Sequence, residues 1–214
     1  MGKSKRPKTR TELEDLEAQG LWRAIALGKN IGEGNEKITL EVILRIHKTI
    51  FEDAIPNIAG RFRVEGEDVK KLKCHEPPPG RLVKEKMYTF WKDLDVRLAT
   101  LSTHPQNQTK TQRSIWFASV IEIATWVQHQ ISYIHPFVEG NGRLARLMTN
   151  LILSRFGLPP SRVKYEGENK AAYLQALCQI DLYGDYEPLK QLIAKSIFEG
   201  YKREQAIRLQ NRKS

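Results

Sequence analysis

The stretch from Trp116 to Arg155, WFASVIEIATWVQHQISYIHPFVEGNGRLARLMTNLILSR, decides the fold that this sequence predicts. Its first part carries the strongest apolar stripe in the chain, spaced as in an amphipathic helix, at Trp116, Val120, Ile123, Ala124, Val127 and Ile131. From Gly142 onward, a second apolar run with the same period indicates another largely buried helix. Two buried helices joined by a short loop predict an all-α fold with this pair at its centre.

Helical patterns continue on the N-terminal side of this pair. A capping-like start at Thr11 opens a first helix, which should end near Gly28 and be followed by a loop. Thr39 opens a second helix, whose polar face holds His47, and we interpret this histidine as structural rather than catalytic. A third helix is expected within residues 83–101, where apolar residues again recur at helical spacing.

On the C-terminal side, the sequence GLPP at residues 157–160 ends the second central helix. Two more helices follow, one over about residues 169–182 and one from near Tyr186 into the basic C-terminal end. Between the second and third helices, Phe62 and Val64 before a turn-like Glu-Gly-Glu predict a short β-hairpin. The sequence thus predicts an all-α protein of about seven or eight helices with one small β-hairpin.

The composition narrows the class of protein. A chain of 214 residues has the length of one domain, and it lacks an apolar run that could span a membrane. The basic N-terminus has no apolar signal core, so we expect a cytoplasmic protein without a membrane partner. Cys74 and Cys178 form no zinc-type grouping, and we expect both to be reduced thiols. The net charge of +10 lies largely at the two ends, which makes nucleic acid a less favoured partner.

The loop that joins the two central helices has the features of an anion site. It reads IHPFVEGNGRLAR at residues 134–146. Gly140 and Gly142 flank Asn141 at the point where the next helix begins, so backbone N–H groups and the positive end of the helix can converge on an anion. Phosphate is therefore the expected guest of this loop.

Charged and titratable side chains complete the loop. Arg143 and Arg146 lie three residues apart on the first turns of the helix, where two guanidinium groups can grip phosphate oxygens. Glu139 adds an oxygen ligand beside those phosphates, the arrangement that holds Mg²⁺ between one carboxylate and a nucleotide. His135 can take a proton from an attacking hydroxyl near neutral pH. Together these residues predict phosphoryl chemistry on a nucleotide.

The same residues resemble the signature of the Fic family, His-x-Phe-x-Asp/Glu-Gly-Asn-Gly-Arg-x-x-Arg, at every specified position. The resemblance extends over nearly the whole chain, because residues 59–63 (AGRFR) look like the family's lead into a flap hairpin and residues 173–177 (YLQAL) look like its later core helix. It implies a Fic core over residues 37–200, preceded by a basic tail and helix at 1–36 and followed by a basic helical tail at 201–214.

The resemblance also implies roles for the loop. The residues divide into a general base, a metal ligand and a phosphate-binding group, namely His135, Glu139, and Gly140, Asn141, Gly142, Arg143 and Arg146. Asn141 with the loop amides would support the α-phosphate, and the two arginines would bind the β- and γ-phosphates. A flap over about residues 64–76, with Val64, Val69 and Leu72 for docking, would pin the target by strand addition.

The activity that follows is transfer of AMP from ATP, with Mg²⁺, to a Tyr, Thr or Ser hydroxyl of a target protein. A kinase-like branch of the family has lysine at the position of Gly142, so the glycine favours nucleotidyl transfer over phosphorylation. Two alternatives stay open: transfer of UMP, GMP or phosphocholine, and a catalytically silent, nucleic-acid-binding or antitoxin-like protein. Assembly into a homo-oligomer is left open as well.

Two acidic residues resemble the inhibitory glutamate of Fic proteins, which follows the pattern Ser/Thr-x-x-x-Glu-Gly/Asn and pairs with the last arginine of the motif. They are Glu33 and Glu199, and each has a lysine, Lys29 or Lys195, where the pattern has Ser or Thr. We favour Glu33 as the inhibitory residue and keep the alternative that neither inhibits. Lys29 lies one helical turn before Glu33 and could hold its carboxylate away from Arg146.

Overall fold

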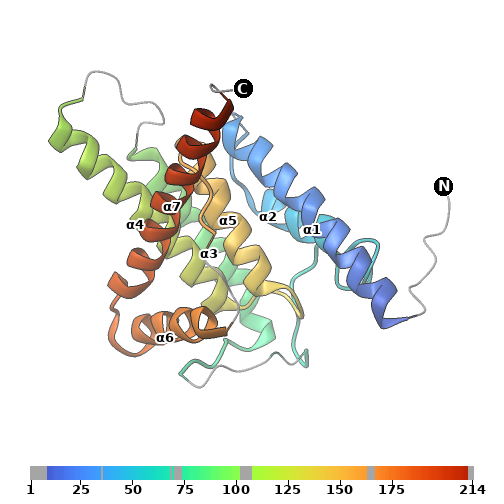
Figure 1. Ribbon diagram of the computed structural model, residues 1–214. Helices are drawn as coiled ribbons and strands as arrows, with labels where there is room; N and C mark the ends of the chain where they lie inside the picture. The colour runs from blue at the N-terminus through green and yellow to red at the C-terminus, as the bar shows by residue number, and fades with distance from the viewer. Residues whose placement is uncertain are drawn as a thin grey trace.

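Helices account for the regular structure of the chain (Figure 1). The computed structural model describes residues 9–34, 36–67, 69, 74–101, 108–162 and 167–211. Within these ranges the helices are Arg10–Glu33 (α1), Leu40–Phe51 (α2), Gly80–Ala99 (α3), Lys110–Ile134 (α4), Asn141–Arg155 (α5), Gly167–Tyr183 (α6) and Glu187–Asn211 (α7). The predicted all-α architecture is confirmed. None of these helices is long and apolar enough to cross a bilayer.

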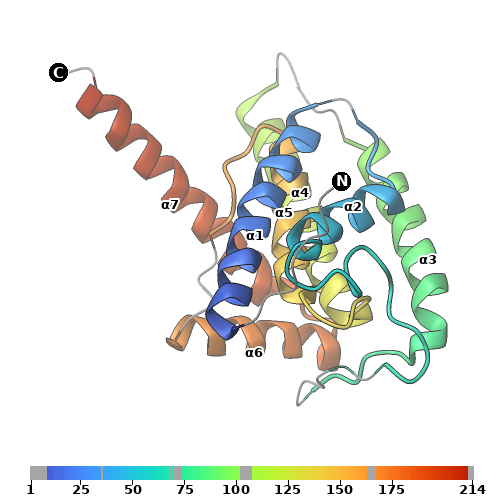
Figure 2. The same ribbon diagram turned by 90° about the vertical axis from the view of Figure 1, so that its right-hand side faces the viewer.

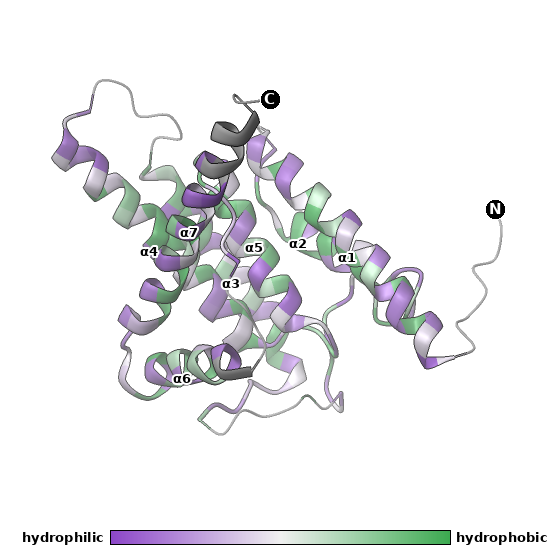
Figure 3. Ribbon diagram, viewed as in Figure 1, coloured by the Kyte–Doolittle hydropathy of each residue, from purple (hydrophilic) through white to green (hydrophobic). Residues whose placement is uncertain are grey.

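Helix α5 lies in the middle of the bundle, between α4 and α1 (Figures 1 and 2). The apolar stripe of α4 is buried, with Val120, Ala124, Val127 and Ile131 fully inaccessible to solvent. Figure 3 shows hydrophobic residues along α4 and α5, whereas hydrophilic residues recur along α1 and α7. The central pair predicted from the sequence is therefore the core of the molecule, and the loop between its two helices rests on that core.

Helix α1 extends beyond its predicted bounds at both ends. It begins after Thr9, whose hydroxyl accepts a hydrogen bond from the Glu12 backbone N–H while the Glu12 carboxylate accepts one from the Thr9 N–H. This reciprocal capping box replaces the predicted start at Thr11. At the other end, the helix passes through the predicted loop and reaches Glu33, with Gly34 as its C-cap. The prediction that it ends near Gly28 is wrong.

Close packing explains the glycines inside α1. A Cβ atom at Gly20 would lie 2.2 Å from the backbone oxygen of Ile50 on α2. At Gly32 it would lie 2.7 Å from the backbone oxygen of Leu151 on α5. Any side chain at either position would push the helices apart. These glycines therefore allow α1 to lie against both neighbours, at the cost of some helix propensity.

The segment between α2 and α3 contains the predicted turn, but its described residues form no strand of a hairpin. The turn is closed by a hydrogen bond from the Glu67 N–H to the Val64 carbonyl, 3.1 Å long, around a left-handed Gly66. Just before it, the N–H of Arg63 donates to the carbonyl of Pro136 in the loop between α4 and α5, residues 135–140, which we name the catalytic loop after its predicted base, His135. Because the N–H of Arg63 donates to the loop and not to a partner strand, the segment forms a turn without the predicted hairpin.

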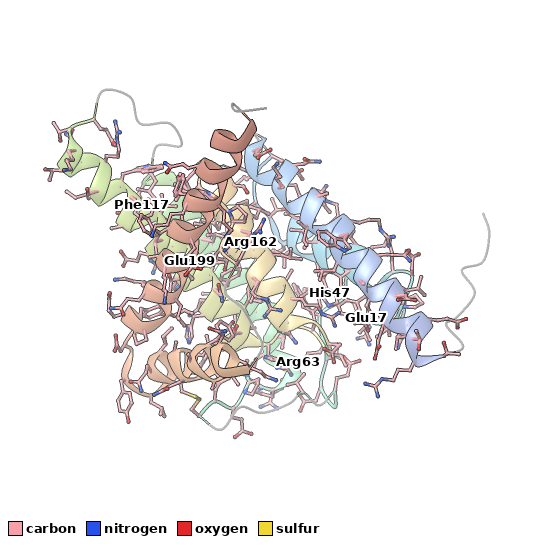
Figure 4. The ribbon with its side chains drawn as sticks, in the orientation of Figure 1. Glu17, His47, Arg63, Phe117, Arg162 and Glu199 are labelled. Carbon is pink, nitrogen blue, oxygen red and sulfur yellow. A yellow bond between two sulfur atoms is a disulfide. The ribbon has the colours of Figure 1, made fainter. Side chains whose placement is uncertain are left out.

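Cys74 and Cys178 form a disulfide, so the prediction of two reduced thiols is wrong. Their Cα atoms are 5.5 Å apart although 104 residues separate them in sequence, and Figure 4 shows the bond in yellow. Neighbouring His75 contributes its Nε2 atom to a 2.7 Å hydrogen bond with the Tyr133 carbonyl. The end of the flap segment is thus attached to both α6 and α4.

Candidate active site

His135 ends α4 in a left-handed conformation, with φ 51° and ψ 59°. Among the described residues it is the one non-glycine with positive φ. This conformation costs a non-glycine residue about 1 kcal/mol or more, and it persists where surrounding contacts hold it. Residues held in this way cluster at functional sites. The position predicted for the general base is thus also the strained point of the backbone.

The hydrogen bonds of His135 determine its tautomer. Its Nδ1 atom lies 3.1 Å from the carbonyl oxygen of Ser132. Because a carbonyl only accepts hydrogen bonds, Nδ1 carries the proton and Nε2 keeps a lone pair. Burial lowers the pKa of His135 below its ordinary value, and the nearby charges of Arg63 and His75 lower it further, against the raising effects of Ser132 and Glu139. His135 is therefore neutral at neutral pH, with Nε2 able to accept a proton.

Helix α5 begins with a glycine that no other residue could replace. Gly140 is the N-cap, with φ 81°, and a Cβ there would lie 2.3 Å from the Phe51 ring. The first N–H groups of a helix have no partner within the helix, and the described residues place no side-chain cap at this end. The N–H groups of Asn141, Gly142 and Arg143 can therefore donate to an anion placed at this end of the helix.

Asn141 closes the loop on itself. Its side-chain oxygen accepts a 2.9 Å hydrogen bond from the Phe137 N–H, and its amide nitrogen donates a 2.7 Å bond to the Phe137 carbonyl. The side chain is buried. The contribution of Asn141 to an anion therefore comes through its backbone N–H and through the loop shape that its side chain maintains.

His47 of α2 packs against the loop and donates a hydrogen bond to it. His47 is fully buried rather than on a polar face, and its ring stacks on Phe137 with 3.6 Å between centroids. The Gly60 N–H donates to Nδ1 at 3.1 Å, so Nε2 carries the proton and donates to the Glu139 carbonyl at 3.0 Å. Burial lowers the pKa of His47 to about 4. Phe137, the partner of this stacking contact, is itself fully buried in the core.

The two motif arginines lie at the first turns of α5. Arg143 places its Nη1 atom 2.5 Å from the carboxylate of Glu17 on α1 and its Nη2 atom 3.7 Å from the carboxylate of Glu139. Its guanidinium carbon lies 4.6 Å from the centre of the Phe51 ring. Figure 4 shows Glu17 on the same side of the molecule as His47. Glu17 is therefore a site residue that the sequence did not predict.

Arg146 turns back over the helix start. Its Nη1 atom is buried and lies 3.4 Å from the position that a Cβ at Gly142 would occupy. A Cβ at Gly142 would therefore be in ordinary van der Waals contact with this guanidinium. The structure thus brings Arg143, Arg146 and the free N–H groups to one end of α5, as the sequence predicts.

Glu139 has the position expected of a metal ligand. Its carboxylate is 58% exposed, and one of its oxygens accepts a 2.9 Å hydrogen bond from the Gly140 N–H. The described part of the chain contains no group of three or more Asp, Glu, His or Cys side chains that could hold a metal ion. One carboxylate beside a phosphate site suits Mg²⁺, which takes its remaining ligands from water and nucleotide phosphates. The residues present fit that ion.

The two candidate inhibitory residues have other partners. Glu33 is 56% exposed and pairs with Lys29 at 3.7 Å, beside a cavity of about 540 Å³ between α1 and α5. Glu199 pairs with Arg203 at 3.8 Å, and Figure 4 shows it on α7, away from Glu17. The pairing of Glu33 with Lys29 is the one that the sequence suggested as an obstacle to inhibition.

The predicted docking residues of the flap are partly described. Val64 is 56% exposed and Val69 is half-buried, whereas Leu72 lies outside the described residues. Val69 borders a cavity of about 420 Å³ next to the catalytic loop. The wall of this cavity combines acidic and proline residues with one arginine: Arg63, Glu65, Glu67, Glu76, Pro77, Pro78 and Pro79.

Known proteins resemble this chain in both sequence and structure. A family model described as the Fic/DOC family matches residues 37–153. A protein named protein adenylyltransferase Fic from Nematostella vectensis is 31% identical over 189 residues, which are 86% of this chain and 38% of that protein. The chain therefore spans about two fifths of the length of this relative.

Solved structures share the fold. Fic-1 (amino acids 134–508) from Caenorhabditis elegans superimposes with a TM-score of 0.67 at 24% identity, over 100% of this chain and 56% of that chain. BepC from Bartonella tribocorum, solved with bound AMPPNP, gives a TM-score of 0.61 at 18% identity, over 89% and 88%. The family model covers more than half of the chain, and its matched region includes α4, the catalytic loop and most of α5. This protein belongs to the Fic/DOC family.

Proposed function

We propose that this protein transfers AMP from ATP to the hydroxyl of a Tyr, Thr or Ser side chain on a target protein. The observation that carries the proposal is the neutral His135, whose Nε2 lone pair is available in the loop that leads into the phosphate-binding end of α5. A base and an anion site in one short loop are what nucleotidyl transfer to a hydroxyl requires.

In the proposed reaction, the hydroxyl oxygen attacks the α-phosphorus of ATP while Nε2 of His135 takes the hydroxyl proton. The bond between the α-phosphorus and its bridging oxygen breaks, and pyrophosphate leaves with the bonding electron pair. Arg143 and Arg146 hold the β- and γ-phosphates, and the first N–H groups of α5 support the α-phosphate. Mg²⁺, held by Glu139 and the nucleotide, would neutralise phosphate charge.

Several observations favour AMP as the transferred group. The relative from Nematostella vectensis is named an adenylyltransferase, and the Bartonella protein was solved with AMPPNP. Gly142 stands where the kinase-like branch has lysine, which favours nucleotidyl transfer over phosphorylation. The rival donors UMP, GMP and phosphocholine differ from AMP in groups that would lie beyond this loop, so they remain outcomes of the experiment below.

Regulation by an acidic side chain is the second part of the proposal. Glu33 and Glu199 are candidates for the inhibitory residue because they resemble the inhibitory pattern, although their ion pairs are with Lys29 and Arg203. Glu17 is a third candidate because its carboxylate contacts the guanidinium of Arg143. A carboxylate at that guanidinium competes with phosphate for the same donors.

Cellular location and assembly also remain proposals. A cytoplasmic location was expected from the basic N-terminus, which has no apolar signal core, whereas the Cys74–Cys178 disulfide is of a kind that is rare in reducing compartments. The disulfide is therefore a reason to determine the location directly. Self-association can be measured in the same preparation by light scattering.

Incubation with cell lysate and α-labelled ATP, GTP, UTP or CTP, or with labelled CDP-choline, tests the function. We expect label from ATP on a protein band, and a loss of about a hundred- to ten-thousand-fold in His135→Ala. His129→Gln is the matched control, because His129 is a buried histidine on the same helix that pairs with Asp181. Label from another donor would reassign the transferred group, and wild-type turnover in His135→Ala would refute the role of the base.

A further inference from the structure

Arg63 makes contacts that neither the motif nor the reaction explains. Its side chain is only 3% exposed. Nε donates to the carbonyl of His135 at 2.7 Å, Nη2 reaches the carbonyl of Ile134 at 3.4 Å, and the backbone N–H donates to the carbonyl of Pro136 at 2.9 Å. One residue thus binds three consecutive carbonyl groups around the catalytic histidine.

The same guanidinium also contacts the base of the flap. Nη2 of Arg63 donates to the carbonyl of Pro78 at 2.5 Å, just before α3 begins. Arg63 itself directly precedes the turn that starts at Val64. Both ends of the flap segment therefore meet at this side chain, which Figure 4 shows below His47.

An arginine suits this position for a physical reason. The last carbonyls of a helix lack partners within the helix and carry the negative end of its dipole. The planar fork of a guanidinium can donate to several of them at once, whereas a lysine ammonium is a single compact point. Arg155 makes a comparable contact at the end of α1: its Nη2 donates to the carbonyl of Ile31 in the last turn at 2.8 Å and to the carbonyl of Glu36, beyond the helix, at 2.5 Å.

The charge of Arg63 also acts on His135. Burial is the main cause of the lowered pKa of His135, and the charge of Arg63 lowers it further. The other groups that face His135 are His75, which lowers the pKa, and the Ser132 carbonyl and Glu139, which raise it. Burial lowers the pKa of Arg63 below its ordinary value, but an arginine guanidinium stays protonated near neutral pH, so this effect is present there.

We propose that Arg63 is a positioning residue for the transfer reaction, which holds His135 in its left-handed conformation and joins it to the base of the flap. This inference rests on the proposed function of His135 as the base. A base displaced by about 1 Å from its productive position can lose on the order of a hundredfold in rate. Arg63 thereby couples the place where a target docks to the group that activates its hydroxyl.

Three variants test this coupling: Arg63→Gln, Arg63→Lys and Arg155→Gln. Arg155→Gln is the matched control, because it removes an arginine that donates to two backbone carbonyls at the end of α1, away from the catalytic loop. The first readout is an NMR titration of the His135 imidazole, assigned by its disappearance in His135→Gln, which needs no enzyme activity. The second is kcat for transfer, and the third is the melting temperature.

We expect Arg63→Gln to raise the pKa of His135 and to lower kcat about tenfold or more. Arg63→Lys should return the pKa towards the wild-type value yet recover only part of kcat, because an ammonium cannot span the same carbonyls. Arg155→Gln should lower the melting temperature without moving the His135 titration.

The inference is overturned if Arg63→Gln titrates like the wild type, or if Arg155→Gln shifts His135 as much. If Arg63→Gln does not fold, Arg63→Lys serves as the test, and a wild-type kcat in Arg63→Lys would overturn the inference that Arg63 positions His135. A wild type that transfers no nucleotide would refute the proposed function, and the titration would still decide the inference about Arg63.

Discussion

The catalytic loop and helix α1 reach the same guanidinium group in different ways. Glu139 of the loop lies four residues before Arg143, and its carboxylate accepts a hydrogen bond from the N–H of the next residue, Gly140. Glu17 of α1 lies 126 residues away in sequence and depends on how the whole helix packs. The contact of Glu139 with Arg143 is therefore local in sequence, whereas the contact of Glu17 depends on how α1 packs against α5. The contact of Glu17 with Arg143 can therefore be removed by a substitution in α1 that leaves the contact of Glu139 in place.

The largest expected effect concerns the support of the loop. The pKa of His47 is about 4 in the folded protein and 6.5 ordinarily, so the neutral ring stabilises the fold above pH 6.5. This stabilisation, about 3 kcal/mol, should be lost as the pH falls from 6.5 to 4. In His47→Gln it is absent, because glutamine does not titrate. Urea unfolding across this range should show the gap between the two proteins closing, and parallel curves would contradict the prediction.

The next effect concerns the arginines of α5. Arg143→Ala and Arg146→Ala should each weaken ATP binding about 10- to 100-fold, since hydrogen bonds between charged groups contribute about 1.5 to 3 kcal/mol. AMP binding should change much less, because AMP lacks the β- and γ-phosphates. Calorimetry with both nucleotides measures the difference, with Arg162→Ala as a surface control. Equal losses for ATP and AMP would place the arginines elsewhere.

A smaller effect is expected from the acidic partner on α1. Glu17→Gln removes the charge that competes for Arg143, so ATP should bind about two- to fivefold more tightly. Asp53→Asn, which breaks the ion pair between Arg23 of α1 and the segment just after α2, is the matched control and should leave ATP binding unchanged. Weaker ATP binding in Glu17→Gln would mean that Glu17 orients Arg143 rather than competing for it.

The smallest effect is expected at Glu33. Its carboxylate is exposed and paired with Lys29, so Glu33→Gly should raise self-modification less than Glu17→Gln does. Comparing the two variants by incorporation of labelled AMP separates the two carboxylates. A larger gain from Glu33→Gly would assign the inhibition to Glu33 and leave Glu17 with a structural role.

The central helices and the loop could be predicted because their residues are contiguous. The period of apolar residues in α4 and α5 defines their buried faces, and the glycines of the loop mark the start of a helix. His135, Glu139 and Arg143 are neighbours in sequence, so short-range geometry already brings them together. The chemistry of the site could therefore be predicted before its surroundings were known.

Features that depend on tertiary packing could not be predicted in this way. Gly28 looked like the end of a helix, yet α1 continues to Glu33 because its other glycines serve close contact with α2 and α5. The residues that flank Glu17 in the chain gave no indication that its carboxylate contacts Arg143. His47 had one indication, since it lies one turn from Phe51 in a buried stripe, and the two rings are 4.8 Å apart.

The disulfide divides the main chain into a closed part and an open part. Between Cys74 and Cys178 the backbone forms a covalent ring that includes α3, α4, the catalytic loop and α5. A protease that cuts one peptide bond inside this ring leaves a single molecule, which separates into two fragments only after reduction. A cut between α1 and α2 releases α1 from the chain without opening the ring. The carboxylate that faces Arg143 therefore belongs to a detachable segment, whereas the catalytic loop belongs to the ring.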